Sequence, residues 1–215
     1  MTTTERHPTS PVERLTWFGH LRIAYDERVL EPRAWTADQS RWAADLLRAG
    51  PSGPVLELCS GAGQIGLLAV ALEPRPLVCV DASPVACAYA RRNADATGWG
   101  GRVEVREGRL DEMLAPQEEF AMVIADPPWV PHADTGRYPA DPLLAIDGGD
   151  DGLGVARECL SVASQHLLRG GSLVLQLGTT AQATRMSGEA SAYGDLVTVD
   201  VRPGERGVLA HLRRP

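Results

Sequence analysis

A strand, a glycine-rich turn and a helix follow one another between residues 55 and 71, and this unit constrains the fold more than any other part of the chain. Val55–Leu58 is a short apolar run that predicts a buried strand, and Ile65–Ala71 is the apolar run of a following helix. Gly61 and Gly63 allow a tight turn and a close approach of the backbone to a ligand. The sequence therefore predicts a nucleotide-type strand–turn–helix unit.

This turn differs from the two common phosphate-binding motifs. Cys59 occupies the first glycine position of the dinucleotide motif, no Gly-Lys-Ser/Thr follows, and the sequence contains no lysine. A second apolar run, Leu77–Val80, ends in Asp81, and an acid at the end of the second strand suits the hydroxyls of a ribose. The alternative interpretation of Asp81 is a helix cap before Pro84.

Apolar runs of strand and helix type alternate along the chain. Predicted strands lie at residues 54–58, 77–81, 102–106, 120–125, 171–177, 195–201 and 206–212, and predicted helices at 36–48, 63–72, 84–97, 152–168 and 180–189. Such alternation predicts a mostly parallel sheet covered by helices on both faces. The last two strands, separated by Arg202–Arg206, predict an antiparallel hairpin. The expected fold is α/β: a three-layer, doubly wound, seven-stranded sheet with a C-terminal hairpin.

A chain of 215 residues suits a single globular domain. We expect a flexible tail over residues 1–13, a hairpin and a helix over residues 14–50, and the main α/β domain over residues 51–215. Within the second part, Leu21–Tyr25 is predicted to pair with Val29–Leu30, and Thr36 to cap the following helix.

The stretch ADPPWVP, residues 125–131, ends a buried apolar strand and points to the chemistry. Each proline fixes its own φ and holds the preceding residue extended, so the carbonyls there are aimed rigidly. Asp126 adds a carboxylate acceptor, and Trp129 adds a flat aromatic face. A planar NH₂ group fits this arrangement, because its hydrogens meet acceptors while its plane stacks. A purely structural Pro-Pro turn is the alternative.

Residues 127–150 form a long loop rich in proline and acid. Loops of this length are commonly lids or binding loops. We expect residues 131–150 to form a mobile lid over an acceptor pocket.

Six segments together resemble a class I S-adenosylmethionine-dependent methyltransferase, and more narrowly the release-factor glutamine methyltransferase (HemK/PrmC) family and its relatives. They occur in the family's order over about residues 27–212: VLEPRAWT (29–36), VLELCSGAGQIG (55–66), VDASPVACAYARRNA (80–94), FAMVIADPPWVP (120–131), AIDGGDDGL (145–153) and GGSLVLQLG (170–178). Each segment alone is weak, but the combination is specific.

The resemblance implies a Rossmann-like methyltransferase domain over residues 51–215. It implies S-adenosylmethionine as the cofactor, S-adenosylhomocysteine as the product, and no metal. It implies that catalysis rests on Asp126, Pro127, Pro128 and Trp129. The residues that it assigns to the cofactor are Glu57, Cys59, Ser60, Gly61, Ala62, Gly63, Asp81, Ala82, Arg109, Leu110 and Asp126.

Some positions depart from the family pattern. The family usually has Asn at position 126 and Tyr at position 129, although the DPPW sequence occurs among amino-group methyltransferases. The acid that normally contacts the adenine amino group is expected directly after Gly108, where this chain has Arg109, with Asp111 two places on. The glutamine enzymes also carry a helical substrate-binding domain before the catalytic one, whereas the resemblance here begins near residue 27. This argues against the release factor as acceptor.

Charge and composition restrict the partners. The chain has 28 acids against 21 bases, a net charge of −7, and a net acidic chain is a poor general binder of nucleic acid. Its four cysteines form no Cys-x-x-Cys, and its five histidines have no metal-ligand spacing. His132 is the one histidine close to the DPPW segment. The sequence lacks a signal peptide and any run of 18 apolar residues, so we expect a soluble, cytoplasmic protein.

Three functions are consistent with these observations. The favoured one is N-methylation of an amide or amino group on a protein side chain or a small molecule. The second is methylation of a nucleic-acid amino group, adenine N6 or guanine N2, which an arginine-rich groove beside Trp129 would support. The third is a non-catalytic protein of the same fold that binds the cofactor or a partner. Nothing in the sequence indicates the oligomeric state.

Overall fold

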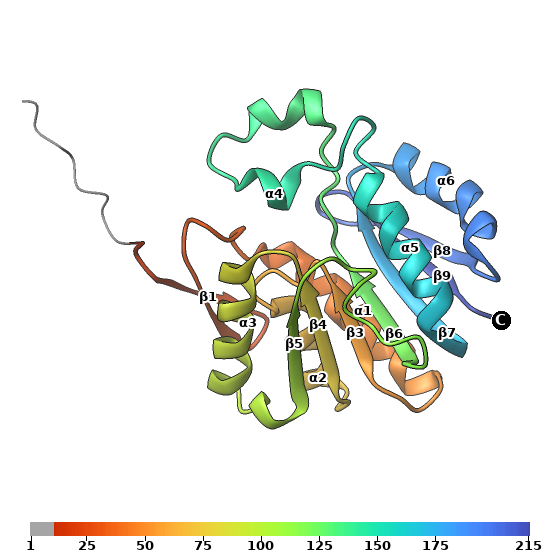
Figure 1. Ribbon diagram of the computed structural model, residues 1–215, viewed down its shortest axis with the longest axis horizontal. Coiled ribbons are helices and arrows are strands. Elements are labelled where there is room, and N and C mark those ends of the chain that lie inside the picture. Colours follow the sequence, from red (N-terminus) through yellow and green to blue (C-terminus); the bar gives the residue numbers. More distant parts are fainter. Residues whose placement is uncertain (1–10) are drawn as a thin grey trace, which may run out of the picture.

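A seven-stranded sheet forms the centre of the computed structural model, which describes residues 11–215 (Figure 1). The strand order is β5-β4-β3-β6-β7-β9-β8. The strands are β3 (Val55–Leu58), β4 (Leu77–Asp81), β5 (Val103–Glu107), β6 (Phe120–Ala125), β7 (Leu167–Leu177), β8 (Val197–Pro203) and β9 (Val208–Arg213). Strands β3 to β7 run parallel, and β9 is antiparallel to both of its neighbours. The predicted α/β architecture with an antiparallel C-terminal hairpin is confirmed.

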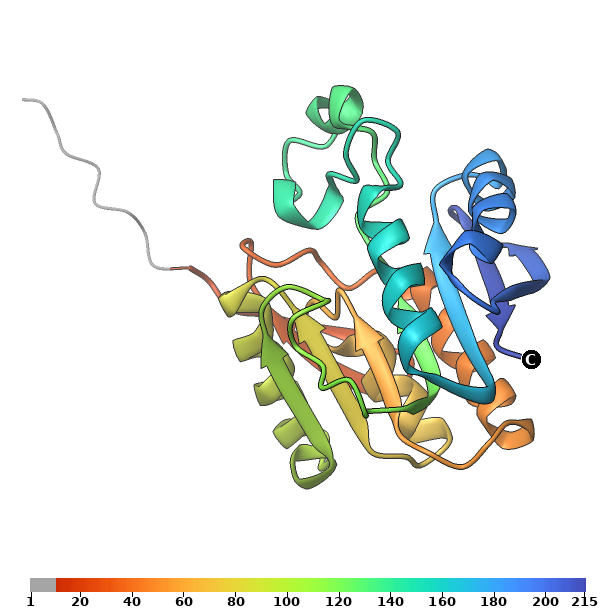
Figure 2. The same cartoon turned by 45° about the vertical axis from the view of Figure 1, so that its right-hand side comes forward.

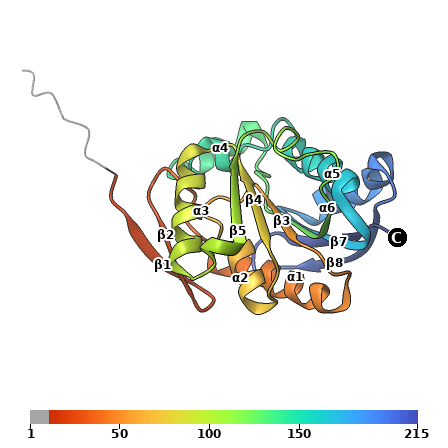
Figure 3. The ribbon, with the colours of Figure 1, turned by 60° about the horizontal axis from the view of Figure 1, so that its bottom comes forward.

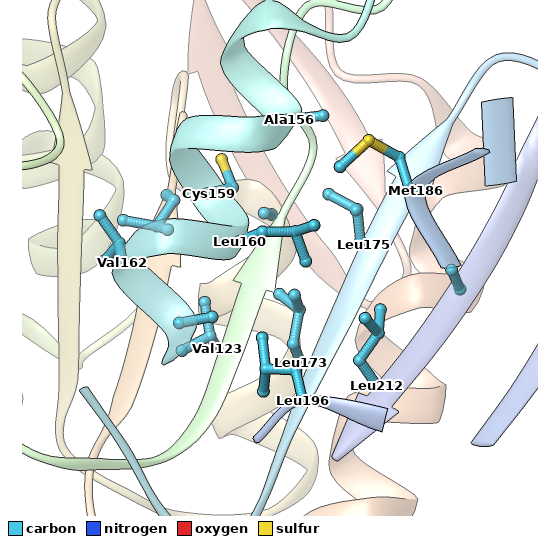
Figure 4. Close-up of a cluster of buried hydrophobic side chains, with 14 of the residues drawn as sticks. Val123, Ala156, Cys159, Leu160, Val162, Leu173, Leu175, Met186, Leu196 and Leu212 are labelled. Carbon is cyan, nitrogen blue, oxygen red and sulfur yellow. The ribbon is translucent and has the colours of Figure 1, made fainter. Parts of the chain in front are cut away.

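Helices cover both faces of this sheet (Figures 2 and 3). One layer holds α1 (Ala37–Ala49), α2 (Gln64–Leu72) and α3 (Pro84–Ala96), whose apolar side chains pack in one core cluster. The other layer holds α5 (Gly154–His166) and α6 (Thr180–Glu189). Figure 4 shows this second core, in which Cys159 and Leu160 of α5 and Met186 of α6 face Leu173 and Leu175 of β7.

The order of the strands determines where a ligand can bind. The chain passes from β3 outward through β4 to β5, then returns to place β6 on the other side of β3. The loops after β3 and β6 therefore leave the sheet in opposite directions. In parallel α/β sheets such a switch point opens a crevice at the carboxyl ends of the strands, and ligands bind there.

The N-terminal hairpin differs from the prediction. It pairs β1 (Arg14–Phe18) with β2 (Leu21–Tyr25), so the predicted pairing of Leu21–Tyr25 with Val29–Leu30 is wrong. The reason is tertiary. Asp26 is buried, accepts hydrogen bonds from the backbone N–H and the guanidinium of Arg28, and so closes a turn where a second strand would begin. Tyr89 of α3 also donates to Asp26, at 2.9 Å, and this contact ties the turn to the helix layer.

Several shorter features complete the chain. Thr36 occupies the N-cap position of α1, as predicted, but its hydroxyl makes no capping hydrogen bond: it donates to the Arg33 carbonyl within a preceding 3₁₀ turn. The short helical segments are η1 (Ala34–Thr36), η2 (Gly100–Arg102), η3 (His132–Arg137), α4 (Leu143–Ile146) and η4 (Ala190–Tyr193). Of the predicted tail, residues 1–10 lie outside the described part, and Glu13 forms an ion pair with Arg92. Within residues 11–215 no helix has the length and apolarity to cross a membrane.

Glu57 is a buried acid between β3 and α2. Its pKa is raised to about 7, mainly by burial, while the Gly66 N–H and the Cys79 thiol act in the opposite direction. A Cβ at Gly66 would lie 2.4 Å from Glu57 Oε2, so the glycine is what lets the helix approach the carboxylate.

This burial predicts a pH-dependent stability. Between its unfolded pKa near 4.5 and about 7, the folded protein holds a proton on Glu57 that the unfolded chain has lost, so stability falls as pH rises through this window. Glu57→Gln removes the titration. We expect the free energy of unfolding of the variant, relative to that of the wild type, to be higher at pH 8 than at pH 5, by at most about 3 kcal/mol. Thermal unfolding of both proteins at the two pH values measures this, and an equal difference at both would contradict it.

Candidate active site

The loops that follow β5, β4, β3 and β6 meet at the carboxyl edge of the sheet and enclose a cavity of about 260 Å³. The cavity lies at the switch point between β3 and β6, where the topology predicts a ligand site. Its floor and walls comprise Arg28, Val29, Leu30, Cys59, Gly61, Gln64, Ile65, Asp81, Ala82, Ser83, Ala86, Gly108, Arg109, Leu110, Asp126, Pro128, Pro142, Leu144, Ala145, Val155 and Glu158.

The turn after β3 has the backbone that its glycines predict. Gly61 and Gly63 have φ values of 54° and 79°, and Cys59 has a φ of 55°, the one positive φ of a non-glycine residue in the described chain. The left-handed region disfavours side chains, so the turn holds Cys59 where glycine would fit without strain. The pKa of its thiol is raised, first by the Cys159 thiol and then by burial. Cys59 is therefore uncharged and is not an activated nucleophile.

Asp81 ends β4 and links two loops of the site. Its carboxylate accepts from the Gly61 N–H at 2.7 Å and from the Ser83 N–H at 2.8 Å. The cap of α3 is Ser83, whose hydroxyl accepts from Ala86 N–H, so capping does not explain Asp81. Burial raises the pKa of Asp81, and the two N–H groups oppose that shift. Each carboxylate oxygen has further lone pairs, and Asp81 lines the cavity, so it can accept from a ligand hydroxyl as well.

Asp126 follows β6 and faces the same cavity. Burial raises the pKa of its carboxyl to about 7. Among residues 11–215 no side chain or backbone group donates a hydrogen bond to it, in contrast to Asp81. A half-buried carboxylate without a protein partner, placed in a cavity, is arranged to accept from a bound molecule.

Trp129 and Pro127 lie outside the cavity wall. A Cβ at Gly178 would stand 2.3 Å from the Trp129 ring, so the ring packs directly on the end of β7. Gln182 of α6 donates to the Trp129 carbonyl at 2.9 Å and accepts from the Gly178 N–H at 3.0 Å. On the other side of the sheet Gln39 donates to the Ala125 carbonyl at 2.9 Å. The DPPW segment is thus held rigidly from both helix layers, which the sequence did not indicate.

The other predicted site residues divide into two groups. Cys59, Gly61, Asp81, Ala82, Arg109, Leu110, Asp126 and Pro128 come together around the cavity. Glu57, Ser60, Ala62 and Gly63 lie behind the turn, buried or at the start of α2, and shape it without lining the cavity. Other cavity residues carry no local sequence signal and meet only in the folded chain, chief among them Arg28, Gln64, Leu144, Val155 and Glu158.

Residues 131–150 fold as η3 and α4 (Figures 1 and 2), and Pro142, Leu144 and Ala145 of this segment line one side of the cavity. The two ends of this segment are joined next to the DPPW residues. The Gly148 N–H donates to the Val130 carbonyl, and the His132 ring hydrogen-bonds to the Asp147 carboxylate at 2.6 Å. Farther out, Arg33 pairs with Asp141 at 2.9 Å. Leu144 both lines the cavity and remains 64% exposed.

These contacts sharpen the lid prediction. We expect hydrogen exchange to be slow at the paired amides of Val130 and Gly148 and fast across residues 138–145, with protection there rising when cofactor and acceptor both bind. Exchange mass spectrometry of the free and the bound protein measures this. Uniformly slow exchange across residues 131–150 in the free protein would make the segment a fixed loop.

The cavity fits the expected cofactor. Asp81 suits ribose hydroxyls, and Oε1 of Gln64, a buried atom in the cavity wall without a donor among the described residues, suits an ammonium group. Leu110 and Val155 offer apolar surface for a purine. No group of three or more potential metal ligands gathers anywhere in residues 11–215.

Comparisons with known proteins identify the relatives of this chain. A family model described as "Methyltransferase domain" matches residues 55–138. The ribosomal protein uL3 glutamine methyltransferase of Burkholderia pseudomallei is 31% identical over 96% of this chain and 70% of its own length. The release factor glutamine methyltransferase of Deinococcus radiodurans is 33% identical over 80% of this chain and 61% of its own. The chain thus spans roughly two thirds of the length of such relatives.

A solved structure with the same fold shows how little the fold alone says about the acceptor. The hMettl16 catalytic domain, determined in complex with the MAT2A 3′UTR hairpin 1, superposes with a TM-score of 0.67 at 15% identity, over 86% of this chain and 71% of that one. At this identity the likeness shows the fold only. The sequence relatives are more specific, and they show that this chain belongs to the class I S-adenosylmethionine-dependent methyltransferases, in the family of the release factor and ribosomal protein glutamine methyltransferases.

Proposed function

We propose that this protein transfers a methyl group from S-adenosylmethionine to an amide or amino nitrogen of a protein side chain. The observation that carries the proposal is Asp126. Its carboxylate accepts no hydrogen bond from residues 11–215, it stands on a rigid Pro-Pro segment, and it lines the same cavity as the glycine turn and Asp81.

The chemistry assigned to the chain is mainly positioning. The sulfonium of the cofactor supplies an electrophilic methyl group with a good leaving group. The protein aligns the acceptor nitrogen about 3 Å from that methyl, and such alignment is worth at most about 7–11 kcal/mol. Asp126 and the Pro127 carbonyl accept the NH₂ hydrogens, which raises electron density on nitrogen and stabilises the positive charge that develops there. No histidine base is needed, because the cationic product loses its proton readily.

Trp129 acts in this proposal as a neighbour of the acceptor and not as a wall of the cofactor cavity. Its ring is anchored on Gly178 and its carbonyl on Gln182, so its orientation is set before an acceptor arrives. A pre-set aromatic face beside Asp126 would hold a planar amide with little loss of entropy on binding.

The surface beside the cavity supports a protein acceptor. Tyr138, Leu143 and Leu144 are 41%, 55% and 64% exposed on the segment that borders Asp126. Exposed apolar side chains gathered next to a reaction centre favour docking of a macromolecular surface over enclosure of a small molecule. The relatives named above act on a ribosomal protein and a release factor, which supports the same class of acceptor.

Methylation of nucleic acid is the second candidate, and the charges near Trp129 weigh against it. Residues 131–150 contain four aspartates and one arginine, Arg137, which pairs with Asp134 at 3.1 Å. On the neighbouring helices Arg157 and Arg185 pair with Asp151 and Glu189. The arginine-rich groove that phosphate binding requires is not formed by the described residues here.

One experiment tests the proposal and its alternatives together. The purified protein is incubated with methyl-labelled S-adenosylmethionine and total cell extract, which is then separated into protein, RNA and small molecules. We expect label in the protein fraction, lost with Asp126→Ala. Label in the RNA fraction would contradict a protein acceptor and favour methylation of nucleic acid. Binding of the cofactor in calorimetry without transfer to any fraction would favour the non-catalytic alternative.

A further inference from the structure

The strand order determines which end of the cavity holds the base of the cofactor and which end holds the acceptor. This assignment rests on the proposed function. Along the sheet edge the lining loops come in the order Gly108–Leu110 after β5, Asp81–Ser83 after β4, Cys59–Gly61 after β3 and Asp126–Pro128 after β6. If Asp81 holds the ribose and Asp126 the acceptor nitrogen, the methyl lies between them. The purine base must then lie on the far side of Asp81, against the loop that follows β5.

Apolar surface for a base is present at that end. Leu110 is buried and belongs to the same core cluster as the α5 side chains, and Val155 of α5 packs against this cluster. Figures 1 and 3 show the chain that leaves β5 crossing the α5 side of the sheet on its way to β6. Leu110 and Val155 both line the cavity, so the base end is bounded by the β5 loop on one side and by α5 on the other.

The side chain next to Leu110 cannot recognise an amino group. Arg109 has donors only, and a purine amino group needs an acceptor. Its guanidinium is 63% exposed and lies 3.4 Å from Asp111 and 3.5 Å from Glu112, so it is directed into an exposed acidic pair. The β5 loop therefore offers no side-chain acceptor to the base from position 109.

Glu158 supplies such an acceptor from the opposite wall. It stands one helical turn after Val155 on α5, so both point to the same side, and both line the cavity. Glu158 lines the same cavity as Arg109 and Leu110 of the β5 loop, and its charge adds to those of Asp111 and Glu112 in raising the pKa of Arg109. Glu158 makes no hydrogen bond or ion pair with any residue in the described range. Apart from Asp81 and Asp126, it is the one carboxylate in the cavity wall.

We propose that Glu158 accepts a hydrogen bond from the exocyclic amino group of the cofactor's adenine and thereby selects an adenosyl cofactor. A carboxylate is an acceptor only, so it attracts a 6-amino purine and repels a 6-oxo purine, whose oxygen presents lone pairs. The selectivity thus comes from helix α5, across the cavity from the loop that carries Arg109.

Titration calorimetry with two ligands tests this: S-adenosylhomocysteine and S-inosylhomocysteine, which carries oxygen in place of the amino group. We expect the wild-type protein to prefer the adenosyl ligand by at least about tenfold, the effect of one hydrogen bond to a charged group. Glu158→Ala should reduce the preference to less than about threefold by weakening adenosyl binding. Glu158→Gln should reduce it by strengthening inosyl binding, because the amide can donate to the 6-oxo group.

Glu112→Gln is the matched control. It removes a like charge beside Arg109 from a residue that, like Glu158, is exposed but that does not line the cavity, and it should keep the wild-type preference. Thermal melting confirms that each variant folds. An adenosyl preference that is absent in the wild type, or unchanged in both Glu158 variants, overturns the role of Glu158 while the cofactor site stands. Failure of the wild type to bind either ligand overturns the proposed function and this inference together.

Discussion

Asp126→Ala is expected to abolish methyl transfer, with a loss of at least about 100-fold in turnover, while cofactor affinity stays within a few-fold. The loss is of the size seen when one preorganised hydrogen bond to a reacting group is removed. Cofactor affinity is spared because Asp81 holds the glycine turn by its own hydrogen bond to the Gly61 N–H, and no hydrogen bond joins Asp81 or this turn to Asp126 among the described residues. Labelled-methyl transfer to the protein fraction and titration calorimetry measure the two quantities.

Asp126→Asn separates the chemical role from a structural one. The amide oxygen still accepts a hydrogen bond, so this variant should keep partial activity. The rival interpretation, a cap on the Pro-Pro turn, predicts about 1 kcal/mol less stability and parallel damage to binding and rate in both variants. An alanine variant that folds, binds cofactor and methylates near the wild-type rate would contradict the amino-group mechanism.

The pKa of Asp126 adds a second signature to the same prediction. Burial raises it to about 7, and the charged form is the stronger acceptor because neither of its oxygens carries a proton. Turnover should therefore fall as pH drops through about 7. The asparagine variant does not titrate and should lose this acidic limb of the pH–rate profile. A limb that persists in the asparagine variant would assign it to another group.

Asp81→Ala is expected to weaken cofactor binding at least tenfold, equivalent to about 1.4 kcal/mol. We expect the loss to exceed that of a single ribose contact, since Asp81 also accepts from the Gly61 and Ser83 N–H groups and so holds two loops of the cavity in place. Calorimetry with S-adenosylhomocysteine gives the affinity, and a melting curve shows whether the fold is intact. Unchanged affinity in a folded variant would remove Asp81 from the site.

The regular elements could be predicted because their signals are local. Strand β4 and strand β6 are continuous apolar runs with the predicted bounds, since a strand buried on both faces excludes polar residues. The hairpin of β1 and β2 was missed because Arg14–Phe18 keeps only Phe18 buried, which leaves little pattern to read. The pairing of residues 29–30 failed because Asp26 accepts from Arg28 and closes a turn there, and the distant Tyr89 holds this buried carboxylate in place.

The residues of the site likewise fall into two groups, those that the sequence identifies and those that only the folded chain brings together. The sequence by itself determined the α/β fold, the glycine turn, Asp81 and the DPPW segment, because each depends on residues that are neighbours in the chain. Only the tertiary structure decided which side chains share the cavity. It packs the Trp129 ring on Gly178, gives Asp126 no hydrogen-bond donor within residues 11–215, and places Glu158 of α5 in the same cavity wall as the loop after β5. The physical reason is that a cavity is enclosed by strand ends and helices far apart in sequence, and no local pattern encodes what they meet.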